Sequence, residues 1–203
     1  MILTEYETAM GLVLGSAVDT STWTTAIKDQ GLRDALVSVT SLWVYEATVT
    51  VTVAGYEQAI APSGVATVLA VLYPWDDTVA WGDAGEEAYH FVGENKVRFE
   101  RVELQVNDEI RVRYTKVQTV NGLDGAVATT VPAAAEDAVM YLACAAAADI
   151  RYRQISENPA IPNSAGAMLA QWARAWRKQA EEWLSAGPAT GVGRVSWGGL
   201  GLG

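Results

Sequence analysis

The stretch LVSVTSLWVYEATVTVTV, Leu36–Val53, decides the fold, because the spacing of its apolar residues changes part-way along it. Up to Trp43 the apolar residues recur every three to five positions, which is the spacing of an amphipathic helix over residues 24–43. From Tyr45 apolar and polar residues alternate, with valines on one face and threonines on the other. The sequence therefore predicts that a helix is followed directly by a half-buried strand.

The segment before this junction predicts a second, earlier helix. Its apolar pattern runs over Leu3–Leu14 and stops at Gly15, a residue that commonly ends helices. Serine and threonine residues in DTSTW, residues 19–23, are candidate N-caps for the helix over 24–43. Gly31 lies inside that helix and is expected to weaken it without excluding it.

The segment after the junction predicts several further strands. A continuous apolar run over Val65–Tyr73 fits a strand covered on both faces, although its length alone does not exclude a buried helical turn. RVELQVNDEIRVRY, residues 101–114, predicts a hairpin with a three-residue loop, which places Leu104 opposite Val112 and Glu103 opposite Arg113. A two-residue loop would instead place Leu104 opposite Arg111. Turn signals at Asn121-Gly122 and Asp124-Gly125 precede a short expected strand over Ala126–Val131.

Helical spacing returns after Pro132, with an Ala-rich helix up to Ile155 and a last helix over residues 164–186. The apolar residues of the last helix share one side of it, opposite the charged residues: Met168, Leu169, Trp172, Trp176, Trp183 and Leu184. The predicted fold is α+β, a helical bundle of two N-terminal and two C-terminal helices with an inserted antiparallel β-domain and an extended C-terminal tail. The predicted domains are N-terminal bundle helices over 1–44, a β-domain over 45–131, C-terminal bundle helices over 132–186 and a Gly-rich tail over 187–203.

The composition disfavours nucleic acid and membranes as binding partners. The 203 residues carry a formal net charge of −10 and half of them are hydrophobic. A strongly acidic protein repels phosphates and anionic lipids, and no apolar run approaches the ~18 to 20 residues that span a bilayer. Glu5 and Glu7 stand where an export signal would be basic, so we expect a soluble protein that is not exported by that route.

The sequence offers few residues for catalysis, and we predict no enzymatic activity, no cofactor and no metal site. His90 is the single histidine, and Cys144, the single cysteine, lies among alanines that indicate a buried core position. The acidic stretch from Asp76 to Glu87 is most simply a solvated loop. Two alternatives stay open there, calcium ligands or an acid–base carboxylate pair, and Trp75 and Trp81 could form a carbohydrate-binding platform.

Two portions of the chain resemble one family. STWTTAIKDQGLRDALVSVTSLW, residues 21–43, resembles the opening helix of tailed-bacteriophage head-to-tail connector proteins, also called adaptors or head-completion proteins. TTVPAAAEDAVMYLACAAAADIRYRQI, residues 129–155, followed by MLAQWARAWRKQAEEWL, residues 168–184, resembles the usual ending of these proteins. The segment from Tyr45 to Val131 departs from the family, because it is larger than in the minimal, all-helical connectors.

This resemblance implies a structural virion protein of the neck, assembled in the host cytoplasm. Such connectors form a homo-oligomeric ring, typically of twelve copies, beneath the portal protein, and they contact the tail or further head-completion proteins. DNA passes through the lumen during ejection without specific binding, and an acidic protein suits that passage. The tail docks on the portal, and we expect its docking residues to be the only part with strand propensity and an aromatic anchor: Arg194, Val195, Ser196 and Trp197.

Overall fold

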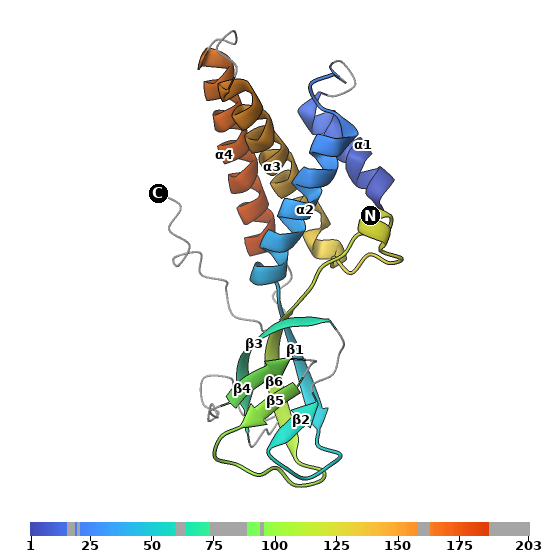
Figure 1. The fold of residues 1–203 in the computed structure, drawn as a ribbon, viewed down its shortest axis with the longest axis vertical. Helices are drawn as coiled ribbons and strands as arrows, with labels where there is room; N and C mark the ends of the chain where they lie inside the picture. The colour runs from blue at the N-terminus through green and yellow to red at the C-terminus, as the bar shows by residue number, and fades with distance from the viewer. Residues whose placement is uncertain are drawn as a thin grey trace. The chain divides into compact units, whose positions relative to one another are not determined.

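The computed structural model describes residues 1–15, 19, 21–59, 64–73, 89–93, 96–157 and 163–186. The chain divides into two compact units. The helical unit comprises residues 1–39 and 118–203, and the β unit comprises residues 40–117. Four helices and two small antiparallel sheets confirm the predicted α+β class (Figure 1).

The helices begin and end within one or two residues of the predicted positions, with one exception. They are α1 (Leu3–Leu14), α2 (Thr25–Leu42), α3 (Glu136–Ser156) and α4 (Asn163–Ala186), with the 3-10 turns η1 (Leu123–Gly125) and η2 (Ala133–Ala135). Helix α3 begins three residues later than predicted, because the 3-10 turn η2 comes between Pro132 and its first residue. Gly15 ends α1 in the left-handed conformation, at φ 70°, where its N–H donates to the carbonyl of Gly11.

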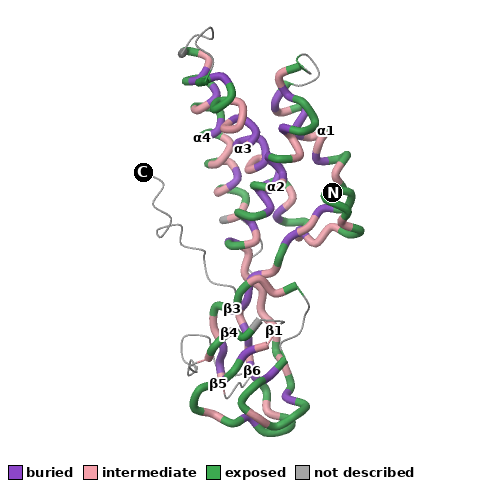
Figure 2. Tube along the Cα trace, in the orientation of Figure 1, coloured by how far each residue is buried: buried purple, intermediate pink, exposed green. Residues whose placement is uncertain are grey.

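Helix α3 forms the centre of the helical unit. Figure 2 shows many buried residues in α3, most of them between Ala138 and Ala148; five of its alanines are buried, with Ala143, Ala147 and Ala148 fully inaccessible to solvent. Both α4 and α1 pack against α3. The alanines give α3 a narrow cross-section, so neighbouring helices approach its backbone closely.

The β unit contains two three-stranded antiparallel sheets around one apolar core. The strands are β1 (Val44–Thr50), β2 (Glu57–Ala59), β3 (Val65–Leu72), β4 (Tyr89–Gly93), β5 (Lys96–Phe99) and β6 (Glu109–Lys116). Their order is β1-β6-β3 in one sheet and β2-β5-β4 in the other. Side chains from both sheets meet in the core, with Val97 and Phe99 of β5 against Val71, Ile110 and Val112.

The predicted hairpin over residues 101–114 is wrong, because β6 takes a different partner. Strand β6 pairs with β1, which places Glu46 opposite Arg113 and Ala47 opposite Val112. Leu104 lies outside the strands and forms an isolated bridge with Gly55. The reason is that the chain before β6 bonds to residues 51 and 55, with Asn107 and Asp108 bonded to Val51 and Leu104 bonded to Gly55.

Two further strand predictions need correction. The segment Ala126–Val131 forms no strand and belongs to the helical unit, where Thr119 and Thr130 bond to each other and the N–H of Leu3 donates to the carbonyl of Asn121. Strand β3 does form, but it is an edge strand with Leu69 exposed rather than a strand covered on both faces.

Candidate functional site: the surfaces of the helical unit

Helix α2 crosses α3 at Gly31, and the crossing leaves no room for a side chain there. A Cβ atom built on Gly31 would lie 2.5 Å from the carbonyl oxygen of Ala143 and 3.2 Å from the Cβ atom of Ala147. Real Cβ atoms do not approach a backbone oxygen so closely. Gly31 is therefore required by the close packing of α2 on α3. This packing joins the two portions of the sequence that resemble connector proteins.

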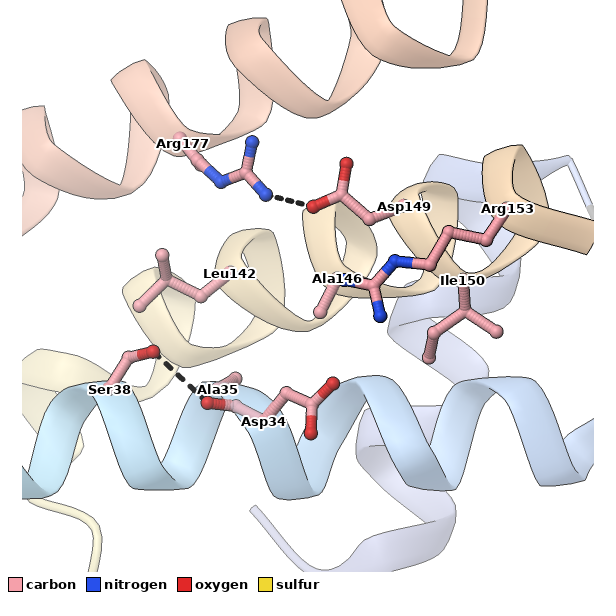
Figure 3. Close-up of a pocket in the computed structure, with 9 residues that line it drawn as sticks. All are labelled: Asp34, Ala35, Ser38, Leu142, Ala146, Asp149, Ile150, Arg153 and Arg177. Atoms are coloured by element: carbon pink, nitrogen blue, oxygen red, sulfur yellow. Dashed lines mark hydrogen bonds and ion pairs between the residues drawn. The ribbon is translucent and has the colours of Figure 1, made fainter. Parts of the chain in front are cut away.

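A small hollow of about 180 Å³ lies beside this crossing, between α2, α3 and α4 (Figure 3). Arg177 of α4 forms an ion pair with Asp149 of α3 at its edge. Asp34 and Arg153 also line it, so two carboxylates and two guanidinium groups balance in charge. None of its nine lining residues is a cysteine or histidine, and the hollow shows the features of a structural ion-pair site rather than a catalytic one.

Helix α4 has an exposed apolar face, so the apolar side predicted from the sequence is buried only in part. Leu169, Ala173 and Ala180 are buried. Trp172 and Trp183 keep 38% and 42% of their surface exposed, and the ring of Trp172 contacts only its neighbour Trp176 among the described aromatic residues, at a centroid distance of 5.8 Å. The apolar stripe of the sequence is thus wider than the surface that α3 covers.

Helices α1 and α2 each contribute a buried polar atom to the helical unit. The Tyr6 hydroxyl and the Oδ1 atom of Asp29 are buried without a hydrogen-bond partner. Burial, followed by the negative charge of Asp137, raises the pKa of Tyr6 above its ordinary value. Burial also raises the pKa of Glu7, and a hydrogen bond and charge repulsion from Asp29 raise it further. Because both pKa values are raised in the folded state, stability is lost as the pH rises, above pH ~4 for Glu7 and above pH ~10 for Tyr6.

The structure places the two residues considered for catalysis in unsuitable surroundings. Cys144 is fully buried in α3, and burial raises the pKa of its thiol to about 12, so the nucleophilic thiolate does not form at neutral pH. His90 lies in the β unit, where its Nε2 atom is 2.6 Å from a carboxylate oxygen of Glu100 and its side chain is 71% exposed. Among the residues that the structure describes, neither Cys144 nor His90 belongs to an arrangement of nucleophile, base and orienting group.

Several predicted site residues lie outside the described part of the chain. These are the tail residues Arg194, Val195, Ser196 and Trp197, the acidic stretch Asp76 to Glu87, and Trp75 and Trp81. Among the residues that the structure does describe, no group of three or more histidine, cysteine, aspartate or glutamate side chains could hold a metal ion. No helix within the same part of the chain is long and apolar enough to cross a membrane.

Comparison with known proteins gives no family assignment. No protein-family model and no curated protein matches this sequence. A chain of the solved structure "Neck of empty GTA particle computed with C6 symmetry" is similar at 17% identity, over 73% of this chain and 78% of that chain, with a TM-score of 0.28. A chain of "Neck of native GTA particle computed with C12 symmetry" is similar at 16% identity, over 84% of this chain and 90% of that one, also with a TM-score of 0.28.

Both neighbours are neck components of GTA particles, which are phage-like gene transfer agents. A TM-score of 0.28 is too low for either neighbour to bear on the function of this chain.

Sequence reasoning missed two features of the helical unit, the close crossing at Gly31 and the exposed side of α4. The crossing had a usable signal, because a glycine within one helical pattern accompanies an alanine run in another. The exposed side of α4 had only a weak signal in the sequence, since Met168, Trp172 and Trp183 belong to the same apolar stripe as the buried Leu169.

Proposed function

We propose that the protein is a structural, non-enzymatic virion protein that forms a ring adaptor between the portal and the tail. One observation carries the proposal. The two portions that resemble head-to-tail connectors come before and after the β unit in the sequence. They nevertheless fold together into one helical unit, with α2 packed on α3 at Gly31. The inserted β unit then provides an additional surface for neighbouring neck proteins.

The proposed C-terminal tail docks on the portal protein. Helix α4 ends at Ala186, and the 17 residues after it include seven glycines, one aromatic residue and one charged residue. So many glycines favour order only on a preformed partner, for example as an added strand. In this proposal Trp197 fills a pocket of the portal and Arg194 pairs with a carboxylate.

The proposed lumen lets DNA slide without retention. The chain has 24 acidic against 14 basic residues, and a basic channel would bind phosphates with a salt-dependent affinity that slows passage. Within the described residues, five basic side chains form ion pairs with acidic neighbours, among them Arg111 and Arg113 with Glu46 and Arg33 with Asp124. This charge distribution fits a conduit better than a DNA-binding protein.

The experiment mixes the purified protein with the portal of the same particle and examines the product by electron microscopy. We expect rings joined coaxially to the portal, and no joined particle would overturn the adaptor function. Trp197→Ala should raise the dissociation constant at least about tenfold, while Val192→Ala in the same tail should change it little. Equal affinities of the two variants and the unaltered protein would contradict tail docking while leaving the adaptor function standing.

The alternative carbohydrate-binding function has no support among the described residues, because its candidate platform at Trp75 and Trp81 lies outside them.

A further inference from the structure

Helix α4 presents two apolar faces, and the described part of its own subunit covers only one of them. Leu169, Ala173 and Ala180 are buried against the rest of the helical unit. Met168 and Trp183, with 46% and 42% of their surface exposed, lie on a neighbouring face together with Trp172. A group of large apolar side chains exposed together on a protein surface usually marks a site that binds another molecule. We therefore expect a binding partner to cover this exposed face.

The exposed face, which we define as Met168, Trp172, Ala175, Trp176, Gln179 and Trp183, carries no charge. At about 100° per residue, these six positions fall within roughly 100° of the helix circumference. The charged residues of α4 lie elsewhere on the helix, and Arg177 already pairs with Asp149. An uncharged aromatic face offers no ion pairs to the phosphates of duplex DNA, whose binding depends on basic residues.

The size of this face suits the centre of a protein interface. The exposed parts of Met168, Trp172 and Trp183 together offer on the order of 300 Å² of apolar surface. A standard interface buries about 800 Å² on each partner, with an apolar centre inside a polar rim. The exposed face thus supplies such a centre, and tryptophan is the residue type most enriched among the residues that dominate binding energy.

We propose that a second copy of this chain occupies the exposed α4 face, an inference that rests on the proposed ring assembly. Each copy has a net charge of −10, so copies repel one another except where an uncharged apolar contact outweighs that repulsion. The exposed α4 face meets that condition.

A ring also needs two different surfaces that meet head to tail. The counter-surface is the α1–α2 side of the neighbouring copy, where Leu12 and Val37 are 78% and 72% exposed. Helices α4 and α1 lie at opposite margins of the helical unit in Figure 1, so a contact of α4 with the next copy's α1–α2 side propagates from copy to copy. Two-fold pairing of identical faces would instead stop at a dimer.

Two alanines of α4 provide a matched test. Ala175 lies on the exposed α4 face and Ala167 lies off it, and both are exposed. Ala175→Glu and Ala167→Glu therefore add the same charge and the same side chain to the same helix. Native mass spectrometry of the full chain should show oligomers larger than a dimer for the unaltered protein and for Ala167→Glu. Ala175→Glu should weaken self-association at least about tenfold, because it buries an unpaired carboxylate.

Circular dichroism shows whether a loss of assembly is caused by unfolding. Both variants should retain the helical content of the unaltered protein. Trp183→Gln, which adds no charge, should weaken assembly in the same direction. Oligomers that resist Ala175→Glu and Trp183→Gln would overturn the α4 contact and leave the ring proposal intact. A protein that is monomeric at all concentrations tested would overturn self-association through this face. The adaptor function is tested separately, by whether the chain joins the portal.

Discussion

Replacing Gly31 by alanine tests the close crossing of α2 and α3 that unites the helical unit. On an isolated helix this change should stabilise, because alanine is favoured over glycine by about 1 kcal/mol in a helix interior. In the folded protein the new Cβ atom would lie 2.5 Å from the carbonyl oxygen of Ala143 and 3.1 Å from the nitrogen of Ala147. Both are backbone atoms, so no side-chain rotation can relieve the contact.

The magnitude follows from how far the helices must separate. Moving the 2.5 Å contact to an acceptable distance requires a shift of at least about half an ångström, and a gap of that size costs about a quarter of the dispersion energy of neighbouring contacts. Overpacking of this kind costs about 1 to 3 kcal/mol, and backbone atoms place Gly31 at the upper end. After the helix-propensity gain is subtracted, we expect Gly31→Ala to lower the free energy of unfolding by about 2 kcal/mol.

Gly166→Ala is the matched control, because it makes the same change in helix α4. There the new Cβ atom would lie 3.0 Å from the ring of Tyr152, whose side chain is 41% exposed and can move aside. We expect that variant to be neutral or slightly more stable. Urea unfolding followed by circular dichroism at a helical wavelength measures both. A Gly31→Ala protein as stable as the unaltered one would refute the close crossing.

Three other predictions concern the polar groups of the helical unit. Tyr6→Phe should raise the free energy of unfolding by about 1 kcal/mol, measured by urea unfolding, because it removes a buried hydroxyl without a partner. Since the Tyr6 pKa is raised in the folded state, the unaltered protein loses stability as the pH rises above ~10. Phenylalanine does not ionise, so the difference in stability between the variant and the unaltered protein should grow in alkaline solution. Glu7→Gln should stabilise at neutral pH, because the raised Glu7 pKa means that the unaltered protein loses stability as pH rises through that pKa, and the advantage should vanish in thermal melts below pH ~4. Arg177→Met, which breaks the partly exposed pair with Asp149, should cost at most about 1 kcal/mol, and added salt should reduce the difference in melting temperature.

The helices were predictable from sequence because each has a local signal at its ends. Gly15 stops α1, Pro132 precedes α3, and the change of period after Trp43 separates α2 from β1. These signals act within a few residues and need no knowledge of the tertiary structure.

Strand pairing was less predictable, because alternation shows which face of a strand is buried but not which strand lies beside it. Arg113 has an acidic residue at the right phase in both Glu103 and Glu46, and the sequence favoured the nearer one. The structure selects Glu46, since the chain around Leu104 bonds to Gly55 instead of to β6. Contacts between residues distant in sequence decided the register.

The exposed α4 face illustrates a similar limit. A helical pattern identifies Met168, Trp172 and Leu169 as one broad apolar stripe, but the width that α3 covers depends on the side chains of α3. Alanines make α3 narrow, so it covers Leu169 and leaves Trp172 exposed.

The central claim, that this chain is a component of the neck, is tested most directly by immunogold electron microscopy of particles produced from the genome that encodes it. An antibody raised against the β unit should place gold at the junction of head and tail. Gold on the head surface, or intact particles that contain none of this chain, would contradict the claim.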